Sequence, residues 1–146
     1  MYFERKIYGK LLEWKASERR KPLIIRGARQ VGKSTLIRAF SKEYNSFIEI
    51  NLERKKDKDI FNLPSVKEVL EVLLLREDMD LNQNELLIFI DEIQESPSAI
   101  QMLRFFYEDY PGLHVICAGS LMEFALNDID SFPVDRVQQL VLYPFD

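Results

Sequence analysis

Residues 23–34 read LIIRGARQVGKS, and this stretch decides the fold. Its first three residues are apolar and lie between Pro22 and Gly27, which favours a buried strand over a helix. Residues 27–34 match the pattern G-x-x-x-x-G-K-[ST] in full. From Lys33 onward the apolar residues recur at helical spacing. A strand, a glycine-rich turn and a helix therefore follow one another, which is the context that the pattern requires.

The turn between this strand and this helix suits a bound polyanion. Glycines let successive backbone N–H groups point inward at phosphates, and the start of the helix adds its positive end. Lys33 offers a flexible positive charge to the β- and γ-phosphates, and the Ser34 hydroxyl suits Mg²⁺. We therefore expect ATP or another nucleoside triphosphate, with magnesium. The alternative is a glycine-rich turn that only joins strand to helix. The expected nucleotide-binding residues are Gly27, Ala28, Arg29, Gln30, Val31, Gly32, Lys33, Ser34 and Thr35.

A pair of carboxylates, Asp91 and Glu92, directly follows the apolar run 86–90. In a parallel sheet this position lies at the carboxyl edge, where open α/β sheets bind ligands. We expect Asp91 to hold the magnesium ion together with Ser34, and Glu92 to polarise the water that attacks the γ-phosphate. Lys33 and the metal would offset the repulsion between these carboxylates and the phosphates. The alternative is that the pair only caps the turn that leaves the strand.

The rest of the chain alternates helices with strands. Expected helices cover 3–16, 64–78, 97–110 and 121–126, and a further helix from Lys33 onward has Leu36, Ile37 and Phe40 on one face. Expected strands cover 23–25, 47–52, 86–90, 113–118 and 140–143, and 53–59 is expected to be a solvated loop. The alternation predicts a three-layer α/β/α domain with a five-stranded, mostly parallel sheet. In the first helix, the apolar positions are Ile7, Leu11, Leu12 and Trp14.

The order of the motifs indicates the class of P-loop NTPase. One expected strand, 47–52, separates the phosphate loop from the acidic pair, and a glutamate directly follows the aspartate. Both features favour the additional-strand ATPases over nucleotide kinases and GTPases, and no Asn-Lys-x-Asp guanine motif occurs. We expect one P-loop ATPase domain over residues 1–146, with a helix and linker over 1–21 and the nucleotide-binding core over 22–146.

The amino-acid composition limits the partners, metal sites and locations that we expect for this chain. The 146 residues are 47% hydrophobic, which is typical of one folded domain with a real core. Twenty Lys and Arg against 24 Asp and Glu give a net charge of -4, so a nucleic-acid partner is possible only through a local patch and has no support from charge. A single cysteine and a single histidine exclude an internal disulfide and a structural zinc site. Without a signal peptide or an apolar run longer than five residues, we expect no membrane partner and a cytoplasmic location.

These motifs resemble the AAA-like ATPases of the AAA+ superfamily in bacteria and archaea. The stretches that carry the resemblance are 26–34, 90–94, 118–120 and 131–137 leading to 142–144. The resemblance implies ATP hydrolysis that drives a conformational change. In many members a winged-helix-like segment and a nuclease-like domain follow the ATPase module. The chain stops at Asp146, just after the expected fifth strand, so the lid, the second sensor arginine and the effector domain would be absent from it.

Two further residues are candidates for catalysis. Ser120 follows the expected fourth strand and could reach the γ-phosphate or its attacking water, if the fifth strand pairs beyond the first. It could instead be only the N-cap of the helix from Leu121, with Glu123 completing a capping box. Arg136 falls where relatives carry an arginine that completes a neighbour's site, which implies a homo-oligomer. Its alternative is a surface arginine paired with Asp135, a position where relatives usually have glycine.

Two functions of different classes follow. The first is an ATPase module that uses Glu92 to activate water. The second is a nucleotide-binding switch that hydrolyses little ATP because the lid and an arginine from a neighbour are missing. Phosphoryl transfer to a small acceptor is less favoured, because no acceptor pocket is readable in the sequence.

Overall fold

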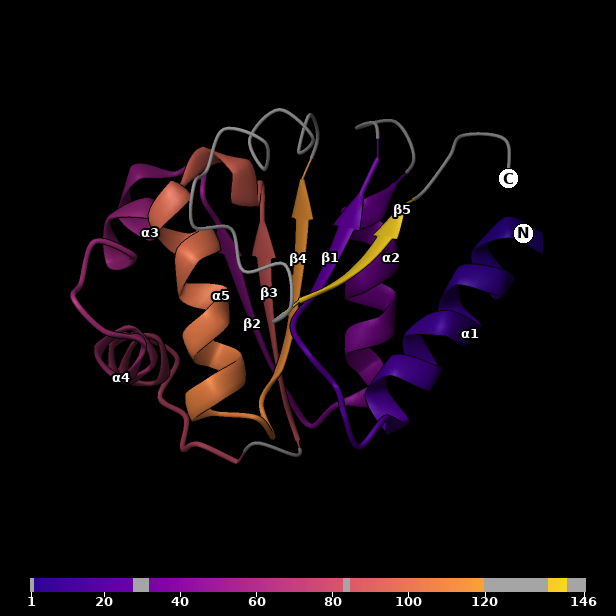
Figure 1. The fold of residues 1–146 in the computed structure, drawn as a ribbon, viewed down its shortest axis with the longest axis horizontal. Coiled ribbons are helices and arrows are strands. Elements are labelled where there is room, and N and C mark those ends of the chain that lie inside the picture. The colour runs from indigo at the N-terminus through magenta and orange to yellow at the C-terminus, as the bar shows by residue number, and fades with distance from the viewer. Residues whose placement is uncertain (1, 28–31, 83–84, 120–136, 142–146) are drawn as a thin grey trace.

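The computed structural model describes residues 2–27, 32–82, 85–119 and 137–141 (Figure 1). The α-helices are α1 (Tyr2–Ala16), α2 (Lys33–Phe40), α3 (Lys55–Ile60), α4 (Val66–Arg76) and α5 (Pro97–Asp109), and two 3₁₀ helices are η2 (Ser41–Glu43) and η3 (Ile93–Glu95). The strands are β1 (Leu23–Arg26), β2 (Ser46–Asn51), β3 (Leu86–Asp91), β4 (His114–Gly119) and β5 (Gln138–Val141).

The five strands form one parallel sheet in the order β2-β3-β4-β1-β5 (Figure 1). Strand β5 pairs with β1, and β4 therefore lies between β1 and β3. The α/β fold with a five-stranded parallel sheet and flanking helices, predicted from the alternation of elements, is confirmed. Because all strands run the same way, their carboxyl ends share one edge of the sheet.

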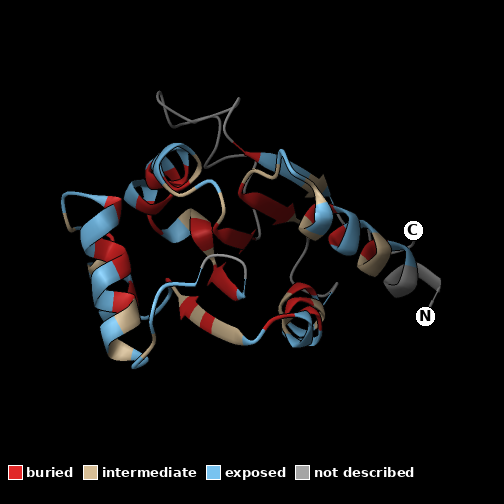
Figure 2. Ribbon diagram, turned by 90° about the horizontal axis from the view of Figure 1, so that it is seen from below, coloured by how far each residue is buried: buried red, intermediate tan, exposed pale blue. Residues whose placement is uncertain are grey.

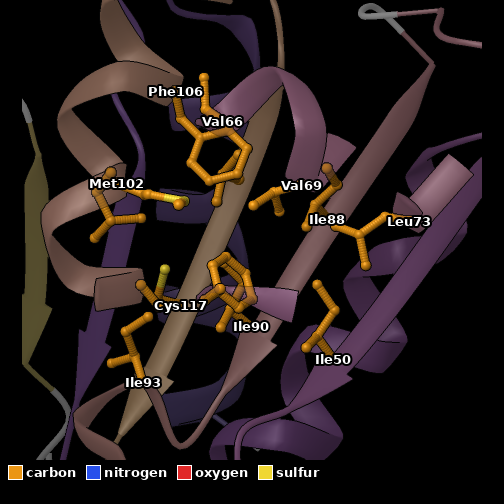
Figure 3. Close-up of a cluster of buried hydrophobic side chains, with 14 of the residues drawn as sticks. Ile50, Val66, Val69, Leu73, Ile88, Ile90, Ile93, Met102, Phe106 and Cys117 are labelled. Atoms are coloured by element: carbon orange, nitrogen blue, oxygen red, sulfur yellow. The ribbon is translucent and has the colours of Figure 1, made fainter. Parts of the chain in front are cut away.

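Helices cover both faces of the sheet because successive residues of each strand point to opposite sides. In β1, Ile24 packs into the cluster that includes residues of α4 and α5, whereas Leu23 and Ile25 pack into the cluster that includes residues of α1 and α2. Figure 3 shows part of the first cluster, in which Ile88 and Ile90 of β3 lie among side chains of α4 and α5, such as Val69 and Met102. Figure 2 shows buried residues on the inner sides of the helices and exposed residues outside. The result is the three-layer arrangement.

Serine caps fix where two of the helices begin. The Ser65 hydroxyl accepts a hydrogen bond from the Glu68 N–H at 3.2 Å, and the Ser96 hydroxyl accepts one from the Ala99 N–H at 3.1 Å. Each bond satisfies an N–H that has no partner inside the helix. Helix α5 therefore starts at Pro97, as the sequence predicts, and α4 starts at Val66.

The prediction of a loop over 53–59 is wrong, because α3 occupies Lys55–Ile60. The reason is a tertiary contact that the polar sequence does not reveal. Asp57 is only 8% exposed; its Oδ2 accepts the Asn51 N–H at 2.9 Å and its Oδ1 accepts Arg76 Nη1 at 2.8 Å. The carboxylate thus ties α3 to the end of β2 and to α4.

Two smaller predictions also need correction. In α1, Ile7, Leu11 and Trp14 are buried, but Leu12 is 40% exposed because it falls beside their stripe. Strand β5 begins at Gln138, two residues before the expected start. The expected helix over 121–126 lies outside the described residues.

Candidate functional site

The glycine-rich turn leaves the carboxyl end of β1 and enters α2. Gly32 is the N-cap of α2 and has φ 71° and ψ 34°, in the left-handed region that glycine adopts without a steric cost. Gly27, at the other end of the turn, has φ 156°. Residues 28–31 between them, with the predicted ligands Ala28, Arg29, Gln30 and Val31, lie outside the described residues.

The Lys33 side chain reaches back to Gly27, which directly follows β1. Although it is the first residue of α2, it is only 5% exposed. Its ammonium Nζ donates a hydrogen bond to the Gly27 carbonyl oxygen at 2.7 Å. The bond connects Lys33 to Gly27, six residues earlier in the chain, and holds a positive charge near the N-terminus of α2, where the helix dipole also favours an anion.

A hydrogen bond joins the turn to the acidic pair, 57 residues further along the chain: the Ser34 hydroxyl donates to Asp91 Oδ2 at 2.9 Å. Asp91 ends β3, is 9% exposed, and accepts the Glu92 N–H at its Oδ1 at 2.9 Å. Burial raises the pKa of Asp91, and the negative charge of Glu92 adds to the rise, while the Ser34 bond opposes it. The site therefore holds a carboxylate whose ionised form gains from a nearby cation.

Glu92 turns the chain away from the sheet. Its φ of 55° and ψ of 49° lie in the left-handed region, which is uncommon for a residue other than glycine. The 3₁₀ helix η3 follows at once, and the Gln94 Nε2 amide donates to Glu92 Oε2 at 2.5 Å. Gln94 belongs to the stretch 90–94 that carries the resemblance to the AAA-like ATPases, but the sequence assigns it no chemical role. The motif therefore pointed to this residue, whereas its contact with Glu92 follows from a tight turn that hydrophobic periodicity does not reveal.

These side chains surround one cavity of about 230 Å³. It is lined by Gly32, Lys33, Ser34, Thr35, Asp91 and Glu92. Every described residue of the predicted site except Gly27 therefore lines this cavity. Gly27 accepts the hydrogen bond of Lys33, which is one of the lining residues. Ser120 and Arg136 lie outside the described residues, and the individual roles of all the site residues stay predictions.

Asn51 lies at the same edge of the sheet, and the sequence prediction does not single it out, although it is not among the residues that line the cavity. Asn51 is the last residue of β2 and is in register with Asp91 of β3. Its backbone N–H donates to the Asp57 carboxylate, as described above. The signal that could have found it is its position, because the carboxyl ends of neighbouring parallel strands share one edge.

The glycine-rich turn after β1, Lys33 and the Asp91 carboxylate at the end of β3 define a P-loop protein. Strand β4 lies between β1 and β3 in the sheet, which defines the additional-strand class. The comparisons with known proteins agree. A family model described as an AAA domain matches residues 19–146, and the chain belongs to that family. The predicted resemblance to AAA-like ATPases is confirmed, and the chain is a nucleotide-binding, ATPase-like module.

Two of the solved structures whose fold is similar to that of this chain are an ORC1 protein and PCH-2. The ORC1 protein of Aeropyrum pernix, in complex with DNA, has a TM-score of 0.65 and 16% identity, over 99% of this chain and 45% of that chain. PCH-2 of C. elegans has a TM-score of 0.57 and 14% identity, over 95% of this chain and 42% of that chain. This chain thus spans less than half the length of each. A search among curated proteins finds no match.

Among the helices of the described residues, none has both the length and the apolar character that crossing a bilayer requires.

Proposed function

We propose that the chain binds ATP with Mg²⁺ and hydrolyses it to ADP and phosphate, and that this reaction drives a conformational change. The observation that carries the proposal is the meeting of Lys33, Ser34, Asp91 and Glu92 around one cavity at the carboxyl edge of the sheet. Each of these side chains has a chemical task in this reaction.

The phosphates would lie in the turn between β1 and α2, against the backbone N–H groups of residues 27–35 and the N-terminus of α2. Lys33 would exchange its bond to the Gly27 carbonyl for a charged phosphate oxygen. Hydrogen bonds between two charged groups are shorter and stronger than those to a neutral carbonyl. The exchange therefore favours the nucleotide-bound state.

The residues present fit a magnesium ion. The Ser34 hydroxyl and the Asp91 carboxylate lie 2.9 Å apart, and oxygen ligands of these kinds are those that Mg²⁺ prefers. Burial raises the pKa of Asp91, so a cation beside it would relieve the cost of its buried charge. When bound, Mg²⁺ would neutralise charge that develops on the phosphates.

Glu92 would act as the general base. A water oxygen forms the new bond to the γ-phosphorus, its proton moves to the Glu92 carboxylate, and the bond from the γ-phosphorus to ADP breaks. Glu92 lines the same cavity as Lys33 and Ser34, which supports this role. Ser120 would contact the γ-phosphate or the attacking water, and Arg136 would supply positive charge to the site of a neighbouring copy in a homo-oligomer.

Single-turnover hydrolysis, measured beside ATP binding by calorimetry, tests the proposal. Replacing Glu92 by glutamine should leave ATP binding within about twofold and slow hydrolysis by about 10²- to 10⁴-fold, the usual contribution of a general base. Glu95→Gln is the matched control, because Glu95 is an exposed residue of η3 in the next turn of chain. Equal, negligible rates in the wild type and Glu92→Gln, with binding intact, would instead establish a nucleotide-binding switch.

We also propose a cytoplasmic location. Binding of DNA by this chain has no support from its charge. The similar ORC1 structure contains DNA, but the net charge of this chain is -4.

A further inference from the structure

We propose that Gln94 is a positioning residue for hydrolysis, and that its side-chain amide holds the Glu92 carboxylate where that group receives the proton of the attacking water. This inference rests on the proposed function, because it assigns the group that orients the proposed base. Gln94 Nε2 donates to Glu92 Oε2 at 2.5 Å. An ionised acceptor makes such a bond stronger than one between neutral groups.

Backbone hydrogen bonds hold the turn that carries Glu92 and Gln94, so the side-chain bond joins two groups on one hydrogen-bonded turn. The Glu95 N–H donates to the Glu92 carbonyl at 3.0 Å, and the Ser96 N–H donates to the Ile93 carbonyl at 3.2 Å. Ile93, between the two polar residues, is fully buried and belongs to the core cluster, in which Figure 3 labels it. Because Ile93 is packed in the core, it holds the turn against the sheet, and its two neighbours in the chain, Glu92 and Gln94, are held with it.

The orientation of the amide depends on Glu92. Gln94 Oε1 is buried and has no hydrogen-bond partner among the described residues. Turning the amide over would place this oxygen against Glu92 Oε2, which is also an acceptor, and the two would repel. A buried acceptor without a partner destabilises the fold. Stability alone therefore does not account for a glutamine here, whereas its contact with the carboxylate does.

Gln94 acts through Glu92 and not on the substrate. Glu92 lines the cavity together with Lys33 and Ser34, and Gln94 is not among the lining residues. The amide thus approaches the carboxylate from outside the cavity. Holding one carboxylate oxygen restricts how the group can turn, and a fixed base close to its proton accelerates the reaction more than a mobile one.

Two substitutions test this role. Gln94→Leu and Gln94→Met keep most of the side-chain volume and remove the donor, so single-turnover hydrolysis should fall about tenfold or more, the effect of losing one hydrogen bond to a charged group. The Kd for ATP, measured by calorimetry, should stay within about twofold, and the free energy of unfolding should be unchanged or higher. The matched control is Gln101→Leu, the same change at an exposed position of α5, which should leave all three quantities unchanged.

The second half of the experiment separates positioning from a general structural effect. In a Glu92→Gln background, Gln94→Leu should cause no further loss of rate, because the group that it positions is already gone. A wild-type rate in both Gln94 variants, or an equal loss in the two backgrounds, would overturn the inference. If Gln94→Leu does not fold, Gln94→Met decides.

The two proposals fail in different ways. If the wild type does not hydrolyse ATP, the proposed function falls and this inference falls with it. If the wild type hydrolyses ATP and Glu92→Gln does not, the proposed function stands, and the Gln94 variants then decide this inference alone.

Discussion

Lys33→Met is the sharpest test of the phosphate site, because it removes one charge and keeps most of the side chain. Lys33 is 5% exposed, and the variant loses the ammonium, which donates a hydrogen bond to the Gly27 carbonyl at 2.7 Å. Losing a hydrogen bond of this kind costs about 1 kcal/mol, and removing a buried charge offsets part of that cost. We expect the free energy of unfolding to change by no more than about 1 kcal/mol.

The effect on nucleotide binding should be much larger. An ammonium and a phosphate charge about 4 Å apart attract by about 4 kcal/mol at the effective dielectric of a partly buried site. Each 1.4 kcal/mol corresponds to about tenfold in affinity, so the Kd for ATP should rise by about a thousandfold.

Calorimetric titration with a slowly hydrolysed ATP analogue in the presence of Mg²⁺ measures this Kd. Lys42→Met is the control, because Lys42 is an exposed lysine of η2, and its affinity should equal that of the wild type. A folded Lys33→Met protein that binds the analogue within about tenfold of the wild type would refute the reasoning. Loss of more than about 3 kcal/mol of stability would show instead that Lys33 serves the fold.

Three further predictions concern buried ionisable groups. Burial raises the pKa of Asp91, so Asp91→Asn should raise the free energy of unfolding without ligand and weaken Mg²⁺-dependent ATP binding, as denaturant titration and calorimetry would show. Burial lowers the pKa of His114 from 6.5 to about 3, below its unfolded value, so the stability it contributes is complete above pH 6.5 and is lost as the pH falls toward 3. The wild type should therefore lose up to about 2 kcal/mol more than His114→Gln between pH 7 and pH 5 in urea titrations; equal slopes would contradict this. Asp57→Ala leaves the partly buried Arg76 without this carboxylate and should cost about 3 kcal/mol, whereas Glu49→Ala, at a more exposed ion pair, should cost less than about 1 kcal/mol by the same measurement.

The central strands β1, β3 and β4 could be predicted from the sequence because they are buried on both faces of the sheet. Runs such as 86–90 are short, apolar and bounded by polar residues, and no helix of that length would be stable. The glycine-rich turn then fixes which edge carries the site. The order of the strands was predicted only on the condition that the fifth pairs beyond the first, and the structure meets that condition.

Other features depend on contacts that no local pattern records. Helix α3 forms in a polar segment because Asp57 bonds to Asn51 and to Arg76, which lie in other elements. The edge strand β5 begins with two exposed glutamines, and Gln138 accepts the Lys21 N–H at 3.0 Å instead of packing in the core. The contact of Gln94 with Glu92 likewise depends on a backbone turn with positive φ that propensity does not predict.

The pairing of β1 has a consequence for how the protein is made. This strand leads into the turn that we propose binds the phosphates, yet its two neighbours in the sheet are β4 and β5, which begin at His114 and Gln138. During synthesis the turn leaves the ribosome early and the strands that anchor it arrive late. A nascent chain arrested before residue 114 would therefore display the apolar stretch 23–25 to chaperones and would not retain ATP.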